Sequence, residues 1–397
     1  MTPRPVHAGA PVLVAVLLIA SCSPDGDPGD PEEAPETVED TDEVDPTDED
    51  AEQTDVEETD DEGRPTDDPE DEAATADGAT VTLLTHDSFD VSEDVLDLFT
   101  ESTGHAVDVV PLGDAGTALN QTILTGDAPQ GDLLFGVDNT FLSRAIDEGI
   151  FTTHESPLLD EVAEGFVLDD QHRVTPVDRG DVCLNYDVAY FEEAGLDVPE
   201  ELVDLTEPEY EGLLTVTNPA TSSPGLAFLL ATVETFGEDG YLDFWERLQA
   251  NDVLVTDGWS EAYYDEFSGA GDGDRPLVVS YASSPPAEVI FAEEEPEAAP
   301  TGVIEASCFR QIEFVGVLAG AEHPDEAGEL IDFMLSEPFQ EDIPLTMFVF
   351  PVNENAELPE VFEEHAVLPD DPLDIDFELI GEHREDWIEA WTAVVLR

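Results

Sequence analysis

Lysine is absent from the 397-residue sequence, and only ten arginines balance 99 Asp and Glu residues, which gives a formal net charge of −89. Proteins that bind nucleic acids neutralise phosphates with basic side chains, so this composition excludes nucleic acid as a partner. Such an excess of hydrated carboxylates is what we expect of a protein that stays soluble in concentrated salt. Because the screening length falls to about 3 Å at about 1 M salt, the surface charge alone does not indicate a cationic ligand.

Long apolar runs are also missing, and the one near the start is too short to span a membrane as a mature helix. Arg4 precedes an apolar run over residues 12–19, and small residues follow before Cys22. This order predicts an export signal over residues 1–21. Ile19-Ala20-Ser21-Cys22 resembles the lipobox of bacterial lipoproteins, so we expect a lipid on Cys22 that anchors an extracytoplasmic protein to the cell membrane. A free thiol after an ordinary cleaved signal is the alternative.

Cysteine is scarce: the chain has three, with no Cys-x-x-Cys motif that would favour a zinc or redox site. If the lipid occupies Cys22, Cys183 and Cys308 remain as an even pair. An oxidising compartment would allow them to form a disulfide. Two separate buried thiols are the alternative.

Apolar residues are rare between residues 23 and 79, where 27 Asp or Glu residues stand against Arg64 alone. This segment cannot bury enough apolar surface to fold, and its like charges repel one another. With Cys22 it predicts a disordered tether over residues 22–79. An acidic interaction tail is the alternative.

Motifs that indicate catalysis do not occur. Gly258-Trp259-Ser260-Glu261-Ala262 lacks the final glycine of a nucleophile elbow, and the histidines show no His-Glu-x-x-His spacing. Phosphate-binding and dinucleotide-binding glycine patterns are missing as well. We therefore predict a protein that is not an enzyme and that carries no metal or cofactor. An extracellular hydrolase that uses Asp or Ser residues is the alternative from another functional class.

After residue 79 the sequence alternates between strand-like and helix-like segments. Five apolar, β-branched runs predict buried strands at residues 81–85, 132–137, 213–217, 253–256 and 277–281. Because a polar loop and a helix-like segment follow each run, the pattern predicts an α/β architecture with largely parallel sheets. Ligands of such folds bind beyond the carboxyl ends of the strands. Ser223-Pro224 and Ser284-Pro285 there predict helix starts with serine at the N-cap.

Five segments at these loops match motifs of a known protein family in order and spacing. They are Thr85-His86-Asp87-Ser88-Phe89, Gly136-Val137-Asp138-Asn139, Thr221-Ser222-Ser223-Pro224-Gly225-Leu226, Gly258-Trp259-Ser260-Glu261-Ala262-Tyr263, and Ser280-Tyr281-Ala282-Ser283-Ser284-Pro285. Ile343-Pro344 and Phe350-Pro351-Val352 follow near the end. From about residue 81 to 397 the chain thereby resembles the periplasmic thiamine-binding proteins of ABC importers. Their superfamily also includes ferric-ion and polyamine binders.

The resemblance implies a two-lobed clamshell of the type II periplasmic-binding-protein kind, with helices on both faces of parallel-rich sheets. Residues 80–178 and 305–397 would form the first lobe and residues 179–304 the second. Strands crossing near 178–186 and 304–313 would form the hinge, and a disulfide between Cys183 and Cys308 would tie them together. The resemblance further implies a monomer that delivers its ligand to an ABC permease and its ATPase.

The resemblance also implies twelve ligand-contacting residues, which are His86, Asp87, Ser88, Asp138, Thr221, Ser222, Ser223, Trp259, Tyr263, Tyr281, Ser283 and Phe348. The thiazolium ring of thiamine is a permanent cation, so Trp259 and Tyr281 would offer it aromatic faces. Asp138 would offset its charge. Ser222, Ser223 and the adjoining helix N-terminus would hold the hydroxyethyl end or a phosphate on it.

Three features depart from the family pattern: His86 and Ala287 stand where the family has tyrosines, and no tryptophan follows Phe89 within the next loop. Phe348 falls where the family has a tryptophan against the ligand. Because these changes reduce aromatic surface, thiamine phosphates or the pyrimidine half alone are alternative ligands. The Tyr263-Tyr264 pair could compensate, but neighbours on a helix point about 100° apart, so we expect at most one to face the ligand. A polyamine or ferric ion is the further alternative, and a helical tyrosine pair disfavours iron.

Overall fold

The computed structural model describes residues 78–397, except 127, 272, 293–295 and 297. The predicted signal peptide, Cys22 and almost all of the predicted tether lie outside the described residues. Within the described part, no helix is both long and apolar enough to cross a membrane.

Nine strands of the described chain form one mixed sheet in the order β2-β1-β3-β8-β4-β7-β5-β6, with β9 paired to β4. They are β1 (Thr80–Thr85), β2 (Ala106–Pro111), β3 (Leu133–Asp138), β4 (Thr175–Asp187), β5 (Leu214–Thr217), β6 (Leu254–Thr256), β7 (Leu277–Tyr281), β8 (Thr301–Val317) and β9 (Phe350–Pro351). β1 pairs in parallel with β2 and β3, and β5 does so with β6 and β7, whereas every pair that includes β4 or β8 is antiparallel. The prediction of largely parallel sheets therefore holds at the two ends of the sheet and not at its centre.

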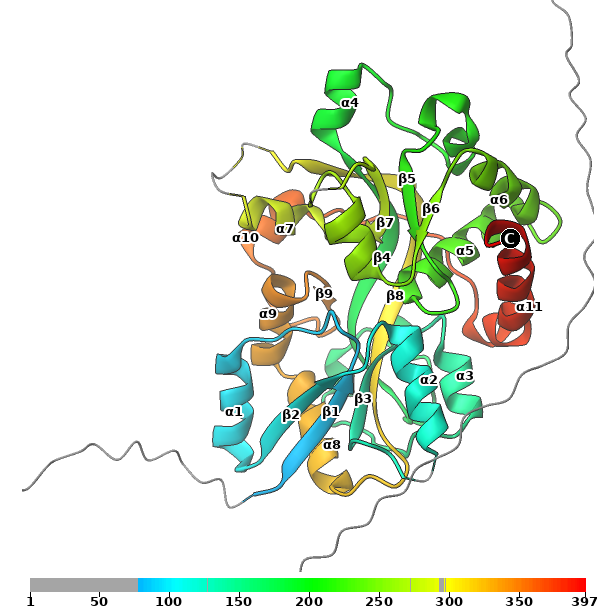
Figure 1. The fold of residues 1–397 in the computed structure, drawn as a ribbon. Helices are drawn as coiled ribbons and strands as arrows, with labels where there is room; N and C mark the ends of the chain where they lie inside the picture. Colours follow the sequence, from blue (N-terminus) through cyan, green and yellow to red (C-terminus); the bar gives the residue numbers. More distant parts are fainter. Residues whose placement is uncertain (1–77, 127, 272, 293–295, 297) are drawn as a thin grey trace, which may run out of the picture. The chain divides into compact units, whose positions relative to one another are not determined.

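The helices of the described chain cover both faces of this sheet (Figure 1). They are α1 (Glu93–Thr103), α2 (Ala115–Thr125), α3 (Leu142–Asp147), α4 (Val188–Ala194), α5 (Ser223–Phe236), α6 (Tyr241–Ala250), α7 (Pro285–Ile290), α8 (Pro324–Met334), α9 (Glu337–Thr346), α10 (Glu360–His365) and α11 (Phe377–Val395). A π-helical segment also spans Glu261–Glu266.

Two long antiparallel strands, β4 and β8, lie at the centre of the strand order and join its two ends (Figure 1). On one side they continue into β3, β1 and β2, which we call lobe 1. On the other they continue into β7, β5 and β6, which we call lobe 2. The predicted α/β clamshell with crossing strands is thus confirmed.

The alternation of apolar residues explains how lobe 1 is layered. In β1, Val81 and Leu83 belong to a core with α1, α8 and α9, whereas Leu84 belongs to the core on the opposite face with α2 and α3. Successive side chains of a strand point to opposite faces, so a strand with apolar residues of both parities needs helices on both sides. β1 is therefore buried on both of its faces.

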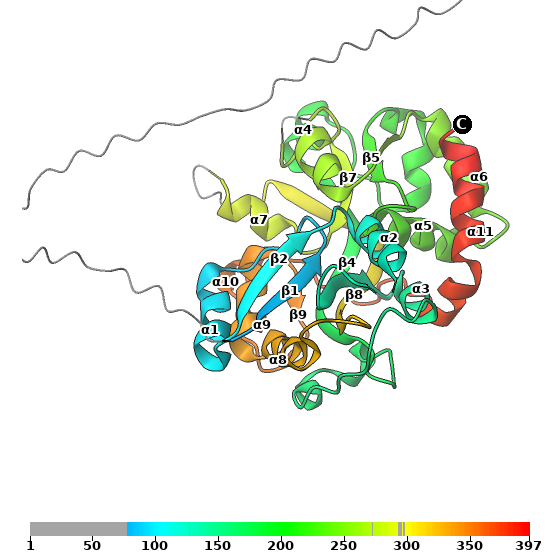
Figure 2. The same ribbon diagram turned by 60° about the horizontal axis from the view of Figure 1, so that its bottom comes forward.

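Helix α11 packs against α6 of lobe 2 and also against α3 of lobe 1 (Figure 2). Its Trp391 is fully buried, and the ring meets Trp245 of α6 edge-on with centroids 5.5 Å apart. The C-terminal helix therefore braces the outside of both lobes, away from the cleft.

Helix α5 begins one position earlier than its Ser-Pro motif predicts. Ser222 occupies the N-cap position and Ser223 is the first helical residue, but the Ser222 side chain makes no capping hydrogen bond. The Ser223 hydroxyl donates instead to Asp138 at the end of β3. Ser284 is the N-cap of α7 as predicted, although its hydroxyl bonds Ser280 rather than the helix.

Candidate functional site

A pocket of about 380 Å³ lies between the lobes, beyond the carboxyl ends of β1, β6 and β7. It is lined by His86, Asp87, Ser88, Phe89, Asp90, Asp114, Ala115, Ser223, Pro224, Trp259, Ser260, Tyr263, Tyr264, Tyr281, Ser284, Ala287, Phe291, Glu313, Thr346, Met347, Phe348 and Val349. The volume lies within the range of small-molecule sites. Eight of the twelve predicted ligand residues are brought together here.

Four aromatic side chains of lobe 2 form one wall of the pocket, which we call the aromatic wall: Trp259, Tyr263, Tyr264 and Tyr281. Trp259 stacks on Tyr263 with ring centroids 4.9 Å apart and planes 20° apart. Its indole nitrogen donates to Ser280 Oγ at 3.0 Å. Because stacking and a hydrogen bond both hold it, the Trp259 ring is set in place before a ligand arrives.

Both tyrosines of the Tyr263-Tyr264 pair line the pocket. That at most one of them faces the ligand stays a prediction. Each ring contacts Trp259, Tyr263 by stacking and Tyr264 edge-on with centroids 5.5 Å apart. Because both rings pack around Trp259, the side chains of Tyr263 and Tyr264 can both border the pocket although their ring planes lie at 89° to each other.

Asp114, at the N-terminus of α2, is a carboxylate that the sequence prediction missed. Its Oδ1 accepts from the N–H of Ala115 at 2.8 Å and of Ser223 at 3.3 Å, and its Oδ2 accepts from the N–H of Trp259 at 3.0 Å. Burial raises the pKa of Asp114, and the hydrogen bond from Trp259 partly opposes this. Since Ser223 and Trp259 belong to lobe 2, Asp114 links the lobes at the pocket edge.

His86 and Glu313 form a second polar group in the pocket. His86 Nε2 lies 3.4 Å from Glu313 Oε1, and Glu313 is 6% exposed. Burial lowers the pKa of His86, but the neighbouring carboxylates, chiefly Glu313, outweigh this and raise it overall. Gly136 makes room for the imidazole, because a Cβ there would come within 2.3 Å of the ring, and its φ of 94° also suits glycine.

The neighbours of His86 on the same loop also reach the pocket. Asp87 and Ser88 line it, and Ser88 Oγ lies 3.4 Å from Ser260 Oγ of lobe 2. The backbone N–H of Ser88 donates to His86 Nδ1 at 3.2 Å. That contact leaves Nε2 as the imidazole atom that faces Glu313.

Asp138 is predicted to offset ligand charge, but it lies behind the pocket and does not line it. It is fully buried and accepts from Thr140 Oγ1 at 2.6 Å, from Gln311 Nε2 at 3.0 Å and from the Ser223 hydroxyl. Burial raises its pKa to about 6, against the effect of these hydrogen bonds. Its oxygens are engaged with β8 and α5, so the carboxylates that line the pocket are those of Asp87, Asp90, Asp114 and Glu313 instead.

Three other predicted residues also lie outside the pocket lining. Thr221 donates to Asp257 O at 2.6 Å and borders an adjoining acidic depression, and Ser222 is fully buried at the start of α5. Ser283 is buried and donates to the carbonyl of Phe348 at 2.6 Å. Phe348 does line the pocket, so Ser283 shapes the pocket wall by holding the backbone of Phe348.

The fold has counterparts among known proteins. A family profile described as "Bacterial extracellular solute-binding protein" matches residues 129–371. The chain belongs to this family. It is a family of transport proteins that work outside the cytoplasm and not a family of enzymes.

The relatives of this solute-binding protein include the thiamine-binding periplasmic protein of Escherichia coli K12, 28% identical over 326 residues that cover 80% of this chain and 94% of the relative. The protein of the same name from Brucella suis biovar 1 is 29% identical over 328 residues, covering 80% and 92%. A solved "Periplasmic thiamin binding protein" has a TM-score of 0.71 and 27% identity, covering 80% and 96%. Iron-bound HitA from Pseudomonas aeruginosa has a TM-score of 0.63 at 20% identity, covering 80% and 99%, and shares the fold.

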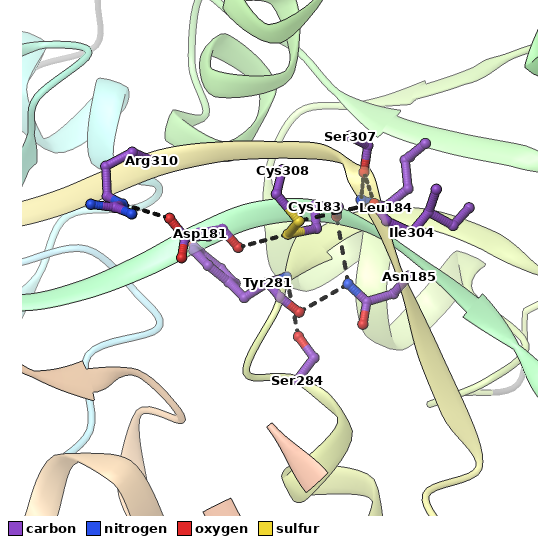
Figure 3. The surroundings of a disulfide bond; sticks show 10 residues. All are labelled: Asp181, Cys183, Leu184, Asn185, Tyr281, Ser284, Ile304, Ser307, Cys308 and Arg310. Carbon is purple, nitrogen blue, oxygen red and sulfur yellow. Dashed lines mark hydrogen bonds and ion pairs between the residues drawn. A yellow bond between two sulfur atoms is a disulfide. The ribbon is translucent and has the colours of Figure 1, made fainter. Parts of the chain in front are cut away.

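In this solute-binding protein a disulfide joins Cys183 of β4 to Cys308 of β8, as predicted (Figure 3). The pairing of the two strands shifts register between Val182 and Leu184. There the Ser307 hydroxyl accepts from the N–H of Leu184 at 2.7 Å. The disulfide and this hydrogen bond hold the crossing strands together at the irregular point beside Tyr281.

The pocket residues that sequence reasoning missed are mainly Asp114, Glu313 and Phe291. Asp114 precedes α2 at the end of a strand, β2, that was not predicted, so its position beyond a strand end was hidden. Glu313 lies at the end of the predicted crossing segment, where only its carboxylate could have singled it out. Phe291 lies four residues after Ala287, the helical spacing that puts two side chains on one face.

Proposed function

We propose that this solute-binding protein holds thiamine between its lobes and delivers it to an ABC permease and its ATPase. The observation that carries the proposal is the aromatic wall of lobe 2 facing the carboxylates of Asp114 and Glu313 across one pocket. Relatives named as thiamine-binding, with alignments over 80% of this chain, support the same ligand.

Thiamine fits the chemistry of this pocket. A permanent cation is attracted to the faces of Trp and Tyr rings, and Trp259 offers such a face next to Tyr281. Glu313 and Asp114 supply negative charge, and Glu313 is buried, where charge pairs attract more strongly than in water. The amino group of the pyrimidine is a donor, and carboxylate oxygens are acceptors.

The polar contacts favour thiamine itself over its phosphates. The N–H groups of Ser223, at the start of α5, and of Trp259 would suit an anion, but both already donate to the Asp114 carboxylate. A phosphate would have to displace Asp114 and approach Glu313 and Asp87. The pyrimidine half alone lacks the cation, so it would lose the attraction to both carboxylates and the aromatic wall.

Ferric ion and polyamines fit less well. Iron would require phenolate oxygens, but burial and Glu288 raise the pKa of Tyr263 well above its usual value, and burial and Glu313 do the same for Tyr281. The hydroxyl of Tyr263 donates to Glu288 at 2.9 Å. A polyamine would gain from the carboxylates but would make little use of a stacked Trp259-Tyr263 pair.

Thermal stabilisation of the purified chain ranks these ligands, because a ligand that binds only the folded state raises the unfolding midpoint. We expect the order thiamine, then thiamine monophosphate, then thiamine diphosphate, with hydroxymethylpyrimidine, spermidine and ferric citrate weaker. A larger shift with spermidine or iron than with thiamine would reject the proposal.

The two lobes are divided within the crossing strands. Lobe 1 takes residues 80–178 and 305–397 and lobe 2 takes 179–304, with both boundaries inside the crossing strands β4 and β8. Ligand contacts with both lobes favour the closed form, which then docks on the permease.

Cys22 carries the lipid and residues 22–79 are the tether, so Cys22→Ala should move the protein from the membrane fraction to the soluble fraction.

A further inference from the structure

Phe291, directly after α7, is a large apolar side chain that is 70% exposed and yet lines the pocket. A single exposed apolar residue is ordinary in a folded protein. This one lies against a second ring at the pocket edge, since its centroid is 5.6 Å from that of Phe348 and the planes are 61° apart. Phe291 belongs to lobe 2 and Phe348 to lobe 1, so the two rings meet across the cleft.

The position of Phe291 on its helix relates it to Ala287. The N–H of Phe291 donates to the carbonyl of Ala287 at 2.9 Å, and residues four apart lie on one helical face. Helical side chains also lean toward the N-terminus, which is the direction of Ala287. Ala287 lines the pocket with only a methyl group. Phe291 therefore brings a ring to the face that Ala287 leaves without one.

The opposing ring is held firmly. Phe348 has a φ of 56°, the left-handed region that non-glycine residues rarely adopt. Its carbonyl accepts from Ser283 Oγ of lobe 2 at 2.6 Å, its N–H donates to Ile343 O at 3.1 Å, and its ring stacks on Phe362 at 6.5 Å. Such strain persists only where the surroundings enforce it, and it is concentrated at ligand sites.

We infer that Phe291 is a specificity-determining residue of this site, which together with the Phe348 ring that it contacts covers a flat, positively charged heteroaromatic ligand against the aromatic wall. The inference rests on the proposed function, because it assumes that the pocket takes such a ligand. Phe291 supplies an aromatic surface that Ala287 lacks, from one helical turn further along. Its exposed ring loses contact with water when the ligand is covered, which favours the closed form.

The test compares thiamine affinity, by titration calorimetry on the purified chain, among wild type, Phe291→Ala, Phe291→Leu and Phe291→Tyr. Ile290→Ala is the matched control, because Ile290 is 40% exposed on the same helix and does not line the pocket. We expect Phe291→Ala to bind roughly five-fold or more weakly, Phe291→Leu to recover only part of the loss, and Phe291→Tyr and Ile290→Ala to match wild type. Ala287→Tyr combined with Phe291→Ala should restore affinity by returning a ring to the same face.

The outcomes separate this inference from the proposed function. Wild-type binding that Phe291→Ala leaves unchanged would overturn the inference and leave the proposed function standing. Equal losses in Phe291→Ala and Ile290→Ala would also overturn it, because they would reflect the stability of α7. If the wild-type chain bound neither thiamine nor 1-methylnicotinamide, a second flat cation, the proposed function and this inference would fall together.

Discussion

Asp138 is a buried carboxylate that connects three parts of the chain. It accepts hydrogen bonds from Thr140 of its own loop, from Ser223 of α5 and from Gln311 of β8. It therefore holds the start of α5 in lobe 2 against the end of β3 in lobe 1. Burial nevertheless raises its pKa to about 6, and the nearby Glu313 adds to the rise.

The raised pKa of Asp138 predicts a specific dependence of stability on pH. A group that holds its proton more tightly in the folded state adds stability that is fully present below its unfolded pKa of about 3.9 and is lost as pH rises toward about 6. The loss is at most about 1.4 kcal/mol per pH unit for one proton. Urea unfolding of wild type and Asp138→Asn at pH 4, 5, 6 and 7 measures it, and the wild-type advantage should shrink from pH 4 to about 6 and then level off.

Asp169→Asn is a control for which we expect the opposite dependence of stability on pH. Burial alone would raise the pKa of Asp169, but hydrogen bonds from Arg173 lower it overall, so its contribution to stability should be lost as pH falls. A difference between wild type and Asp138→Asn that stays constant from pH 4 to 7 would show that Asp138 does not take up a proton in this range.

The sequence predicts the pocket lining well when a motif places residues at or just after the end of a predicted strand, as for His86, Trp259 and Tyr281. It fails where the direction of a side chain depends on a partner far along the chain. Asp138 ends β3, but Ser223 and Gln311, which come 85 and 173 residues later, engage it away from the pocket. Asp114 and Glu313 face the pocket for equally long-range reasons.

Among the elements, the crossing strands β4 and β8 decide how the lobes are joined. Both strands are longer than the segments predicted from the sequence, because 178–186 and 304–313 cover only their central parts. Strand β2 was missed because the run Ala106–Pro111 contains the charged Asp108 and ends in proline. It is also an edge strand that β1 alone pairs with, so its residues need less apolar character than those of a central strand.

The Cys183–Cys308 bridge between these strands should contribute strongly to stability. It closes a loop with a sequence separation of 125 residues, for which the chain-entropy argument gives on the order of 4 to 5 kcal/mol. Guanidinium unfolding of the double variant Cys183→Ser, Cys308→Ser should show a free energy of unfolding lower by about that amount. Wild type unfolded with excess thiol reductant is the control and should behave like the variant; identical midpoints for oxidised wild type and variant would contradict this view.

For the whole molecule, the formal net charge of −89 is the dominant physical property. Self-repulsion of like charges opposes a compact state, and salt shortens the range of that repulsion from about 30 Å at 0.01 M to about 3 Å at 1 M. The composition therefore predicts a chain that becomes more stable as salt rises.

Thermal unfolding in sodium chloride from 0.01 to 2 M at pH 7 measures this effect, and the midpoint should rise with salt. At pH 4 many carboxylates are protonated, so the same series should give a much smaller rise. A midpoint at pH 7 that does not depend on salt would mean that the acidic surface does not limit stability.

The central claim is that thiamine binds between the lobes against Trp259, and titration calorimetry of thiamine into the purified chain tests it most directly. We predict saturable binding of one thiamine per chain and, for Trp259→Ala, a loss of more than about 1 kcal/mol of binding free energy, with most of the affinity kept in Trp259→Phe. An absence of binding to the wild-type chain, or equal affinity in wild type and Trp259→Ala, would contradict the account.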